Sequence, residues 1–305
     1  MYDLIGKKWW FFIFSGLIII PGIISLFLWG IRLSIDFTGG TLLEIKFLEK
    51  QPSSNQQVEQ VIKQEDIGFV SVSGTREKTY LLRLKPIDKN QNEKLQQKLS
   101  EKISPVTEIR FETVGPTVGQ ETTKNAVKAV IAASLAIIIY IALSFRHIPK
   151  PYSSWKFGVA AVVALIHDVL VVIGIFSLLG HFYHVEIDSL FITALLTVMG
   201  FSVHDSIVVF DRIRENLRKM TGTPFDKIVN VSLVQTLARS ISTSLTVIFT
   251  LFALLLFSGA SIRWFIVALL IGITSGTYSS IFNASPLLVI WEDWSKKRLH
   301  TPRVH

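Results

Sequence analysis

The feature that most constrains this chain is a set of long apolar segments. About 20 apolar residues in a row form a helix long enough to cross the roughly 30 Å hydrocarbon core of a bilayer. Six such segments occur, near residues 10–29, 126–145, 157–179, 189–210, 240–257 and 264–290. Half of the 305 residues are hydrophobic and the mean hydropathy is +0.46, which argues against a soluble globular protein. We therefore predict an α-helical membrane protein with six transmembrane helices.

The distribution of positive charge predicts the orientation of these helices. The net charge is +8, and Lys and Arg gather before the first apolar segment, between the second and third, between the fourth and fifth, and after the sixth. Cytoplasmic segments carry an excess of Lys and Arg, so both termini are predicted to be cytoplasmic, with residues 292–305 as a basic tail. Because topology accounts for the charge, no nucleic-acid partner is expected.

The first apolar segment is predicted to be a retained anchor and not a cleaved signal peptide. Bulky residues, Phe27, Leu28 and Trp29, stand where a small-residue cleavage site would be needed. Residues 1–31 are thus assigned to the cytoplasmic N-terminus and the first helix, and residues 125–291 to the other five helices with their loops.

Residues 32–124 separate the first two helices and are predicted to form an external α+β domain. The pattern alternates strand-like and helix-like segments, at residues 41–48, 54–66, 69–74, 78–85, 90–103 and 106–114. This order, β-α-β-β-α-β, is that of the ferredoxin-like fold. The domain has no His, no Cys and no Gly-rich phosphate loop. We expect it to bind or dock and not to catalyse a reaction.

A carboxylate stands inside the fourth apolar segment. Asp205 precedes Asp211 by six residues, which is about 9 Å along a helix. If Asp211 marks the cytoplasmic interface, Asp205 lies within the hydrocarbon, where an ionised carboxylate is costly and usually functional. Asp205 and the neighbouring imidazole of His204 are therefore candidates for proton conduction.

The fifth apolar segment carries one polar stripe, which we call the polar stripe throughout. Its members recur at helical spacing: Gln235, Arg239, Ser242, Thr246 and Thr250. The stripe is predicted to face protein or water and not lipid. Since the fourth helix runs toward the cytoplasm and the fifth runs away from it, Arg239 and Asp205 can share one depth, and we predict that they are partners.

The third and sixth segments add further polar groups. His167 and Asp168 lie near the middle of the third. One face of the sixth has small or polar residues that allow close helix packing: Gly272, Gly276, Ser279 and Asn283. The four helices are expected to bring two carboxylates, two imidazoles and a guanidinium into one buried region, a composition that suits a proton path.

Proton coupling through such a region has a simple physical basis. A carboxylic acid in a medium of low dielectric constant holds its proton tightly, and a nearby guanidinium weakens that hold. A motion that changes the distance between Asp205 and Arg239 would then change proton affinity. The alternative is a static ion pair that fixes helix register, and for His167 a packed imidazole with a satisfied N–H group.

The same residues argue against a metal centre or an enzyme. Adjacent residues on a helix point about 100° apart, so each His-Asp pair offers one ligand to a shared ion, and no second ligand falls on the same face. An intramembrane serine protease is disfavoured because the Ser residues occupy packing positions. We predict no metal, no cofactor and no catalytic residue.

Six motifs, in order along nearly the whole chain, resemble the SecD/SecF family of the RND superfamily. They are IDFTGGT (35–41), VGPTVGQE (114–121), IHD (166–168), VHDSIVVFDRIREN (203–216), QTLARSISTSLT (235–246) and GTYSSIFNASPLL (276–288).

The resemblance implies an RND-type half bundle in the cytoplasmic (inner) membrane of a bacterium. It implies an auxiliary subunit of the Sec protein translocase that couples the proton-motive force to preprotein export. The implied partners are a SecD-like subunit, the SecYEG channel, unfolded preproteins and the lipid bilayer, with YajC as a further candidate. Asp205 and Arg239 match the motifs of the family's proton-conducting centre, whereas His204 replaces the Asn that many relatives have.

Two alternatives for function stay open at this point: half of a proton-driven small-molecule exporter of the RND type, and a structural membrane scaffold.

The DFTGG motif is interpreted as the turn by which the chain leaves the membrane and enters a strand. Gly115, Pro116 and Gly119 are expected to shape the return connection.

Overall fold

The computed structural model describes residues 2–52, 54–65, 67–74, 78–146, 148–149 and 152–300. The chain divides into two compact units, one formed by residues 33–128 and the other by residues 1–32 and 129–305. We call them the sheet unit and the helical unit. Lys150, in the basic loop after the second apolar segment, and the end of the predicted basic tail, residues 301–305, lie outside the described residues.

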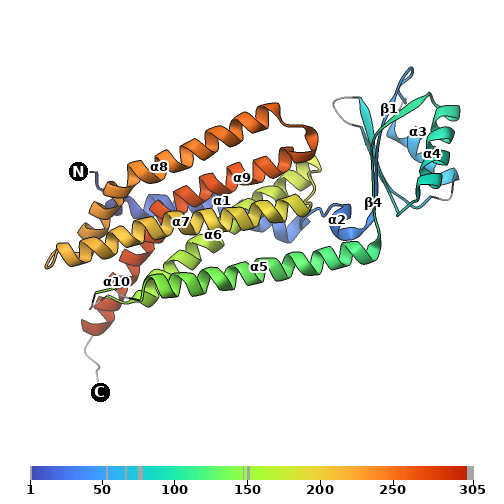
Figure 1. Ribbon diagram of the computed structural model, residues 1–305. Coiled ribbons are helices and arrows are strands. Elements are labelled where there is room, and N and C mark those ends of the chain that lie inside the picture. The colour runs from blue at the N-terminus through green and yellow to red at the C-terminus, as the bar shows by residue number, and fades with distance from the viewer. Residues whose placement is uncertain are drawn as a thin grey trace. The chain divides into compact units, whose positions relative to one another are not determined.

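The elements of the sheet unit follow the predicted β-α-β-β-α-β order, except for one short helix, α2 (Ile35–Thr38), which precedes the first strand and was not predicted. The other elements are β1 (Gly40–Phe47), α3 (Asn55–Gln64), β2 (Phe69–Gly74), β3 (Thr79–Leu84), α4 (Lys89–Lys102) and β4 (Val106–Val114). The strands form one antiparallel sheet in the order β2-β3-β1-β4, and Figure 1 shows α3 and α4 on the same face of it. The ferredoxin-like prediction is confirmed.

Alternation along β1 explains how this unit forms its core. Leu43, Ile45 and Phe47 point to the helix-covered face and are buried, whereas the residues between them point to the other face. They pack with apolar residues of α3 and α4, including Val58 and Leu95. The sheet and its two helices thus bury one shared apolar layer.

The two glycine motifs of the sheet unit meet in space. Gly39 and Gly40 have φ values of +70° and +131°, which L-residues with a Cβ rarely adopt. A Cβ on Gly119 would lie 2.8 Å from the amide nitrogen of Gly39 and 3.0 Å from the carbonyl oxygen of Phe37. Gly119 belongs to α5 (Pro116–Ser144), so the DFTGG segment is a tight contact between the outgoing and the returning chain as well as a turn.

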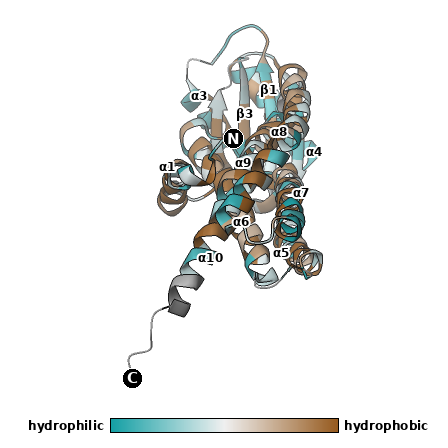
Figure 2. Cartoon of the chain, turned by 90° about the vertical axis from the view of Figure 1, so that its left-hand side faces the viewer, coloured by the Kyte–Doolittle hydropathy of each residue, from teal (hydrophilic) through white to brown (hydrophobic). Residues whose placement is uncertain are grey.

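The helical unit contains the predicted transmembrane helices. Its elements are η1 (Ile5–Lys7), α1 (Lys8–Trp29), the end of α5, α6 (Ser154–Tyr183), α7 (Ser189–Lys219), α8 (Phe225–Phe257), α9 (Ala260–Ser279), η2 (Ser280–Ala284) and α10 (Ser285–His300). Six helical stretches are long and apolar enough to cross a membrane, and hydrophobic residues dominate them (Figure 2). The chain is a multi-pass membrane protein.

The six membrane-spanning helices differ in how much of each is buried. Half of the most apolar stretch of α6 and of α7 is buried, against 6% for α5. Helices α6, α7 and α9 therefore form the centre of the bundle, and α1 and α8 pack on its outside (Figure 1). The sixth span is interrupted by the π-helical turn η2, because Pro286 has no N–H group for the carbonyl of Phe282.

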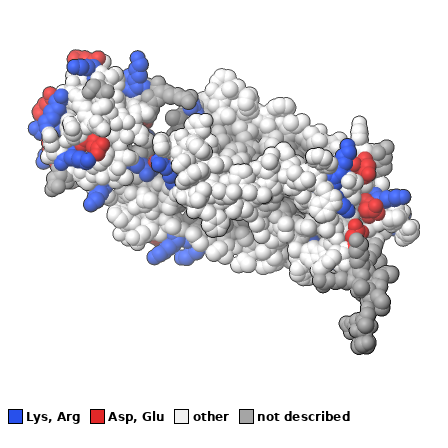
Figure 3. All heavy atoms as spheres, turned by 180° about the vertical axis from the view of Figure 1, so that it is seen from behind, with Lys and Arg blue, Asp and Glu red and all other residues white. Residues whose placement is uncertain are grey.

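Polar contacts close both ends of the helical unit. At one end Asn230 accepts hydrogen bonds from the amides of Leu4 and Ile5, and Lys156 Nζ lies 2.7 Å from Glu292 Oε2. At the other end the amide of Ile187 donates to the carbonyl of Arg32. Figure 3 shows charged side chains at the α10 end and none over the middle of the visible face, as a membrane-spanning surface requires.

Candidate functional site

The most deeply buried charged group of the helical unit is Asp168, on α6. Its side chain has no exposed surface. Three hydroxyl groups donate to its carboxylate: Ser275 to Oδ1 at 2.7 Å, Ser202 to Oδ2 at 2.5 Å and Ser279 to Oδ2 at 2.6 Å. These donors come from α7 and α9, so one carboxylate joins the three central helices.

A chain of polar groups leads from Asp168 to α1. His167 Nδ1 lies 3.0 Å from Asp168 Oδ1, and its Nε2 lies 3.0 Å from Ser15 Oγ. Ser15 Oγ is 2.8 Å from Asn283 Nδ2 and 3.1 Å from Asn283 Oδ1. We call Asp168, its three Ser donors, His167, Ser15 and Asn283 the Asp168 network.

Asp205 forms a second cluster, between α7, α8 and α9. The residue is 2% exposed. Ser244 Oγ donates to Asp205 Oδ2 at 3.4 Å, and Thr277 Oγ1 donates to Ser244 Oγ at 2.6 Å. Because α7 supplies Ser202 to the Asp168 network and Asp205 one turn later, the two clusters are neighbours along that helix.

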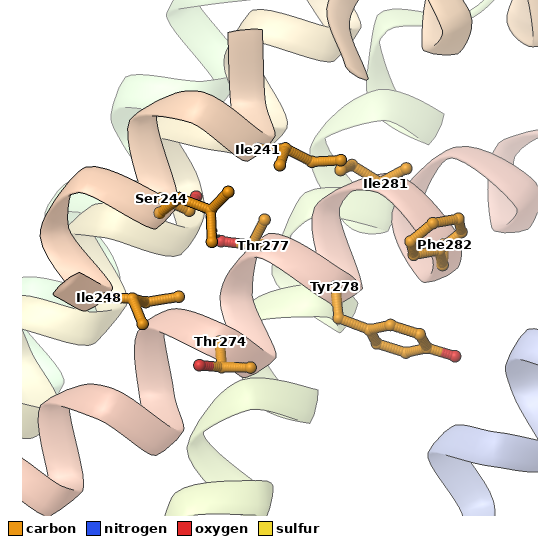
Figure 4. A pocket seen from close by; sticks show the side chains of 9 residues that line it. Ile241, Ser244, Ile248, Thr274, Thr277, Tyr278, Ile281 and Phe282 are labelled. Atoms are coloured by element: carbon orange, nitrogen blue, oxygen red, sulfur yellow. Dashed lines mark hydrogen bonds between the residues drawn. The ribbon is translucent and has the colours of Figure 1, made fainter. Parts of the chain in front are cut away.

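A pocket opens beside the Asp205 cluster, between α8 and α9. Its volume is about 200 Å³, and most of its lining is apolar: Ile241, Ser244, Leu245, Ile248, Thr274, Thr277, Tyr278, Ile281 and Phe282. Figure 4 shows Ser244 and Thr277 facing each other in its wall. Tyr278 points toward α1, where its hydroxyl donates to the carbonyl of Phe11 at 2.8 Å. Ser244 and Thr277 thus stand between this pocket and Asp205.

The structure does not place Arg239 against Asp205. Arg239 is exposed, and its guanidinium has no hydrogen bond or ion pair with any residue that the structure describes. The contact with Asp205 comes instead from Ser244, five residues further along α8. Five residues correspond to about 140° around a helix, so Arg239 points away from the bundle.

The rest of the polar stripe is exposed together with Arg239. Gln235, Ser242, Thr246 and Thr250 are all exposed residues of α8, and Gln235 reaches α7, where its Oε1 accepts from Asn216 Nδ2 at 2.9 Å. Gln235 accepts from Arg212 Nε at 2.6 Å. His204 is also exposed, since it is one residue from buried Asp205. The expectation of one buried region is therefore wrong for the described residues, because Asp168 and Asp205 belong to separate clusters and Arg239 and His204 are exposed.

Sequence reasoning missed several members of the two clusters. Ser15 is a lone hydroxyl in an apolar helix, and Ser244 and Ser240 share a second four-residue spacing on α8, beside the polar stripe. Ser275 and Thr277 flank the predicted Gly276. The sequence thus shows a polar residue at each of these positions. Such residues do not by themselves indicate a buried cluster, because Ser and Thr often bond to their own helix, as Ser244 also does with the carbonyl of Ser240.

The fold and the two clusters together define a multi-pass membrane protein with ionisable groups buried inside its helical bundle. Residues 94–294 match the family described as protein export membrane protein SecD/SecF, C-terminal, and residues 24–47 match the SecD/SecF GG motif. The chain belongs to the SecD/SecF family. The GG motif contains the glycine pair that contacts α5.

Individual relatives agree with this assignment. The chain is 49% identical to protein translocase subunit SecF of Thermobaculum terrenum, over 96% of this chain and 95% of that protein. It is 35% identical to protein translocase subunit SecDF of Bacillus subtilis, over 97% of this chain and 39% of that protein. The crystal structure of SecDF from Thermus thermophilus, a translocon-associated membrane protein, superposes with a TM-score of 0.81 at 34% identity, and the match covers 96% of this chain and 39% of that one.

Proposed function

We propose that this chain is an auxiliary subunit of the Sec translocase that works with a SecD-like partner to couple the proton-motive force to preprotein export. Asp205 carries the proton, Arg239 modulates its affinity, and the sheet unit handles unfolded preprotein outside the cytoplasmic membrane. The SecYEG channel is the source of that preprotein. The observation that carries the proposal is a carboxylate, Asp205, buried between α7, α8 and α9.

Relatives support the SecD-like partner. The chain matches 39% of the SecDF of Bacillus subtilis and of Thermus thermophilus, whose names join SecD and SecF in one polypeptide. We therefore propose that this chain works together with a counterpart of the part of SecDF that it does not match.

The polar stripe supports the same conclusion on physical grounds. A guanidinium facing hydrocarbon is costly, yet Arg239 lies on the outer side of α8. Ser242 and Thr246 continue the exposed polar surface toward the middle of the helix. A partner subunit that covers α8 would remove this surface from lipid.

Polar groups near Asp205 support a path for protons. The hydroxyls of Ser206 and Ser240 are buried and have no hydrogen-bond partner among the described residues. Buried hydroxyls are normally satisfied by protein or by ordered water. The interior between α7 and α8 therefore has the hydrogen-bonding capacity to hold water beside the carboxylate.

Orientation follows from charge. The end of the helical unit that bears Lys156, Arg212 and Lys219 is assigned to the cytoplasm because basic segments stay on that side. The end where α1 leads into the sheet unit then faces outward, which puts residues 33–128 outside the membrane.

The test is preprotein import into inverted membrane vesicles that contain this chain and its SecD-like partner, with and without a proton gradient. Asp205→Asn and Arg239→Met are expected to lose the gradient-dependent stimulation while assembling normally. Asp205→Asn keeps the shape of the side chain but cannot ionise, and Arg239→Met keeps much of its length but has no charge.

Asp211→Asn is the matched control, because its carboxylate lies on the same helix and is 56% exposed. It is expected to leave stimulation intact. Gradient-dependent stimulation that survives in both Asp205→Asn and Arg239→Met would contradict the proposal. Loss of assembly in these variants would instead favour a scaffold function for the buried charge.

A further inference from the structure

The Asp168 network has features that a simple packing contact does not need. Each carboxylate oxygen of Asp168 has two partners: Ser275 and His167 at Oδ1, and Ser202 and Ser279 at Oδ2. Hydroxyl groups donate at three of these four contacts, and an imidazole N–H can donate at the fourth. Only the ionised carboxylate accepts from all four, so the geometry favours an anion at Asp168.

A fully buried anion is stabilised by hydrogen-bond donors and further by a cation close by, because both offset its desolvation. Among the residues that the structure describes, His167 is the one basic side chain within ion-pair distance of Asp168. Its side chain retains 12% exposure, whereas that of Asp168 has none. His167 is therefore both the counter-ion and the member of the pair that a proton can reach.

The contacts on the far side of His167 suit two protonation states. When Nε2 carries no proton, Ser15 can donate its hydroxyl to Nε2 and accept from Asn283 Nδ2, 2.8 Å away. When Nε2 carries a proton, Ser15 can accept from it and donate to Asn283 Oδ1, 3.1 Å away. The bond between Ser15 and Nε2 reverses direction, and both the ring nitrogen and the hydroxyl of Ser15 keep a partner in either state.

We propose that His167 is a second proton-binding site of the helical unit, separate from Asp205. The His167 ring gains and loses a proton at Nε2. Asp168 stays ionised, and its carboxylate holds the other ring proton in place on Nδ1 of His167. The proton leaves or enters by way of Ser15, whose hydroxyl reverses. The link of this site to export rests on the proposed function, but its existence does not.

The other ionisable groups on the surrounding helices have contacts outside the Asp168 network or are exposed. On α7 they are His204, which is exposed, and Asp205, which bonds to Ser244. On α9 Tyr278 donates its hydroxyl to the carbonyl of Phe11. Between Trp9 and Trp29, α1 has no ionisable side chain. A change in the charge of the network therefore occurs on the His167 ring.

The test measures the protonation state of the two ring nitrogens of His167. The full chain, labelled with ¹⁵N-histidine and assembled with its SecD-like partner in lipid bilayers, is observed by solid-state NMR from about pH 5 to about pH 8, the range in which histidine usually titrates. We expect two protonated ring nitrogens at the acidic end. At the alkaline end we expect loss of the Nε2 proton alone, which leaves the Nδ1–H tautomer.

A ring that stays in one protonation state over this range, or a neutral ring that carries its proton on Nε2, would overturn the proposal. The chain has seven His, so the His167 signal is identified by its absence in His167→Asn. If that variant does not fold, the same signal is isolated by replacing the other six, starting with exposed His204.

Two further variants test the pairing with Asp168. In Asp168→Asn the ring is expected to stay neutral throughout, and a ring that still becomes doubly protonated would exclude Asp168 as its counter-ion. Ser275→Ala is milder, because it removes one donor from the oxygen that faces His167. It changes the hydrogen bonding of the oxygen that contacts Nδ1, so the Nδ1 signal of the ring is expected to shift, and an unchanged signal would count against the pairing.

Failure of this inference is distinguishable from failure of the proposed function. A titrating His167 together with gradient-independent export would contradict the proposed function and support the inference. A His167 that does not titrate, together with gradient-dependent export, would do the reverse.

Discussion

Single residues decide where backbones can meet in this protein. Gly119 contacts the backbone of Gly39 and Phe37, which is possible only because no Cβ stands between them. The atoms that a Cβ would meet belong to the main chain and cannot rotate away. This contact closes the base of the sheet unit where the chain enters and leaves it.

Gly119→Ala is therefore expected to destabilise the sheet unit by about 1–3 kcal/mol, the usual cost of overpacking. Gly115→Ala is the matched control from the same connection, because a Cβ there meets nothing within 4 Å. Protease resistance and thermal unfolding of the full chain would measure the difference. Equal stability of the two variants would show that the contact between the glycine motifs is not required.

At the scale of elements, small residues bring α9 onto α7. Gly276 lies against Ser202, and Gly272 lies against Val198, which is 1% exposed. This close approach lets Ser275 and Ser279 reach Asp168, while Thr277, which follows Gly276, reaches Ser244. The packing of two helices thus assembles both buried clusters.

Gly272→Ala is expected to lower the free energy of unfolding by about 1–3 kcal/mol, because the new Cβ would lie 2.2 Å from a methyl group of Val198, a stiff β-branched side chain. Gly200→Ala on α7 is the control, since a Cβ there has open space. It is expected to be neutral or slightly stabilising. Unfolding in detergent would compare the two, and a neutral Gly272→Ala would contradict the close packing of α9 on α7.

At the scale of the whole molecule, the helical unit leaves α8 with a polar outer side. The buried side of α8 carries Ser240 and Ser244, and the exposed side carries Arg239, Ser242, Thr246 and Thr250. A helix with polar groups on two sides suits a position between two protein surfaces. The chain supplies one of these surfaces, and the SecD-like partner is proposed to supply the other.

A photo-crosslinking amino acid at Thr246 is therefore expected to form an adduct with the SecD-like partner in assembled membranes. The same probe at Ile139, which is 59% exposed on α5, is the control and is expected to react with lipid. Gel mobility and mass spectrometry would identify the adducts. Partner adducts from Ile139 but none from Thr246 would place the interface on α5 instead.

Local sequence patterns were sufficient to predict the transmembrane helices and the order of strands and helices in the sheet unit. Hydropathy predicted the six transmembrane helices, and alternation predicted the β-α-β-β-α-β order, because both patterns depend on neighbours along the chain. Asp168 and Asp205 were recognisable as buried candidates for the same reason: an acidic residue in the middle of an apolar helix is visible without any knowledge of its surroundings.

The tertiary structure decided which groups meet. Periodicity gives the angle between two residues on a helix, but not the rotation of that helix about its own axis within the bundle. The sequence therefore located the polar stripe of α8 but could not show that Ser244, and not Arg239, faces Asp205. In the same way, Ser15 is paired with His167 across 152 positions of the chain, a contact that only the packing of α1 against α6 creates.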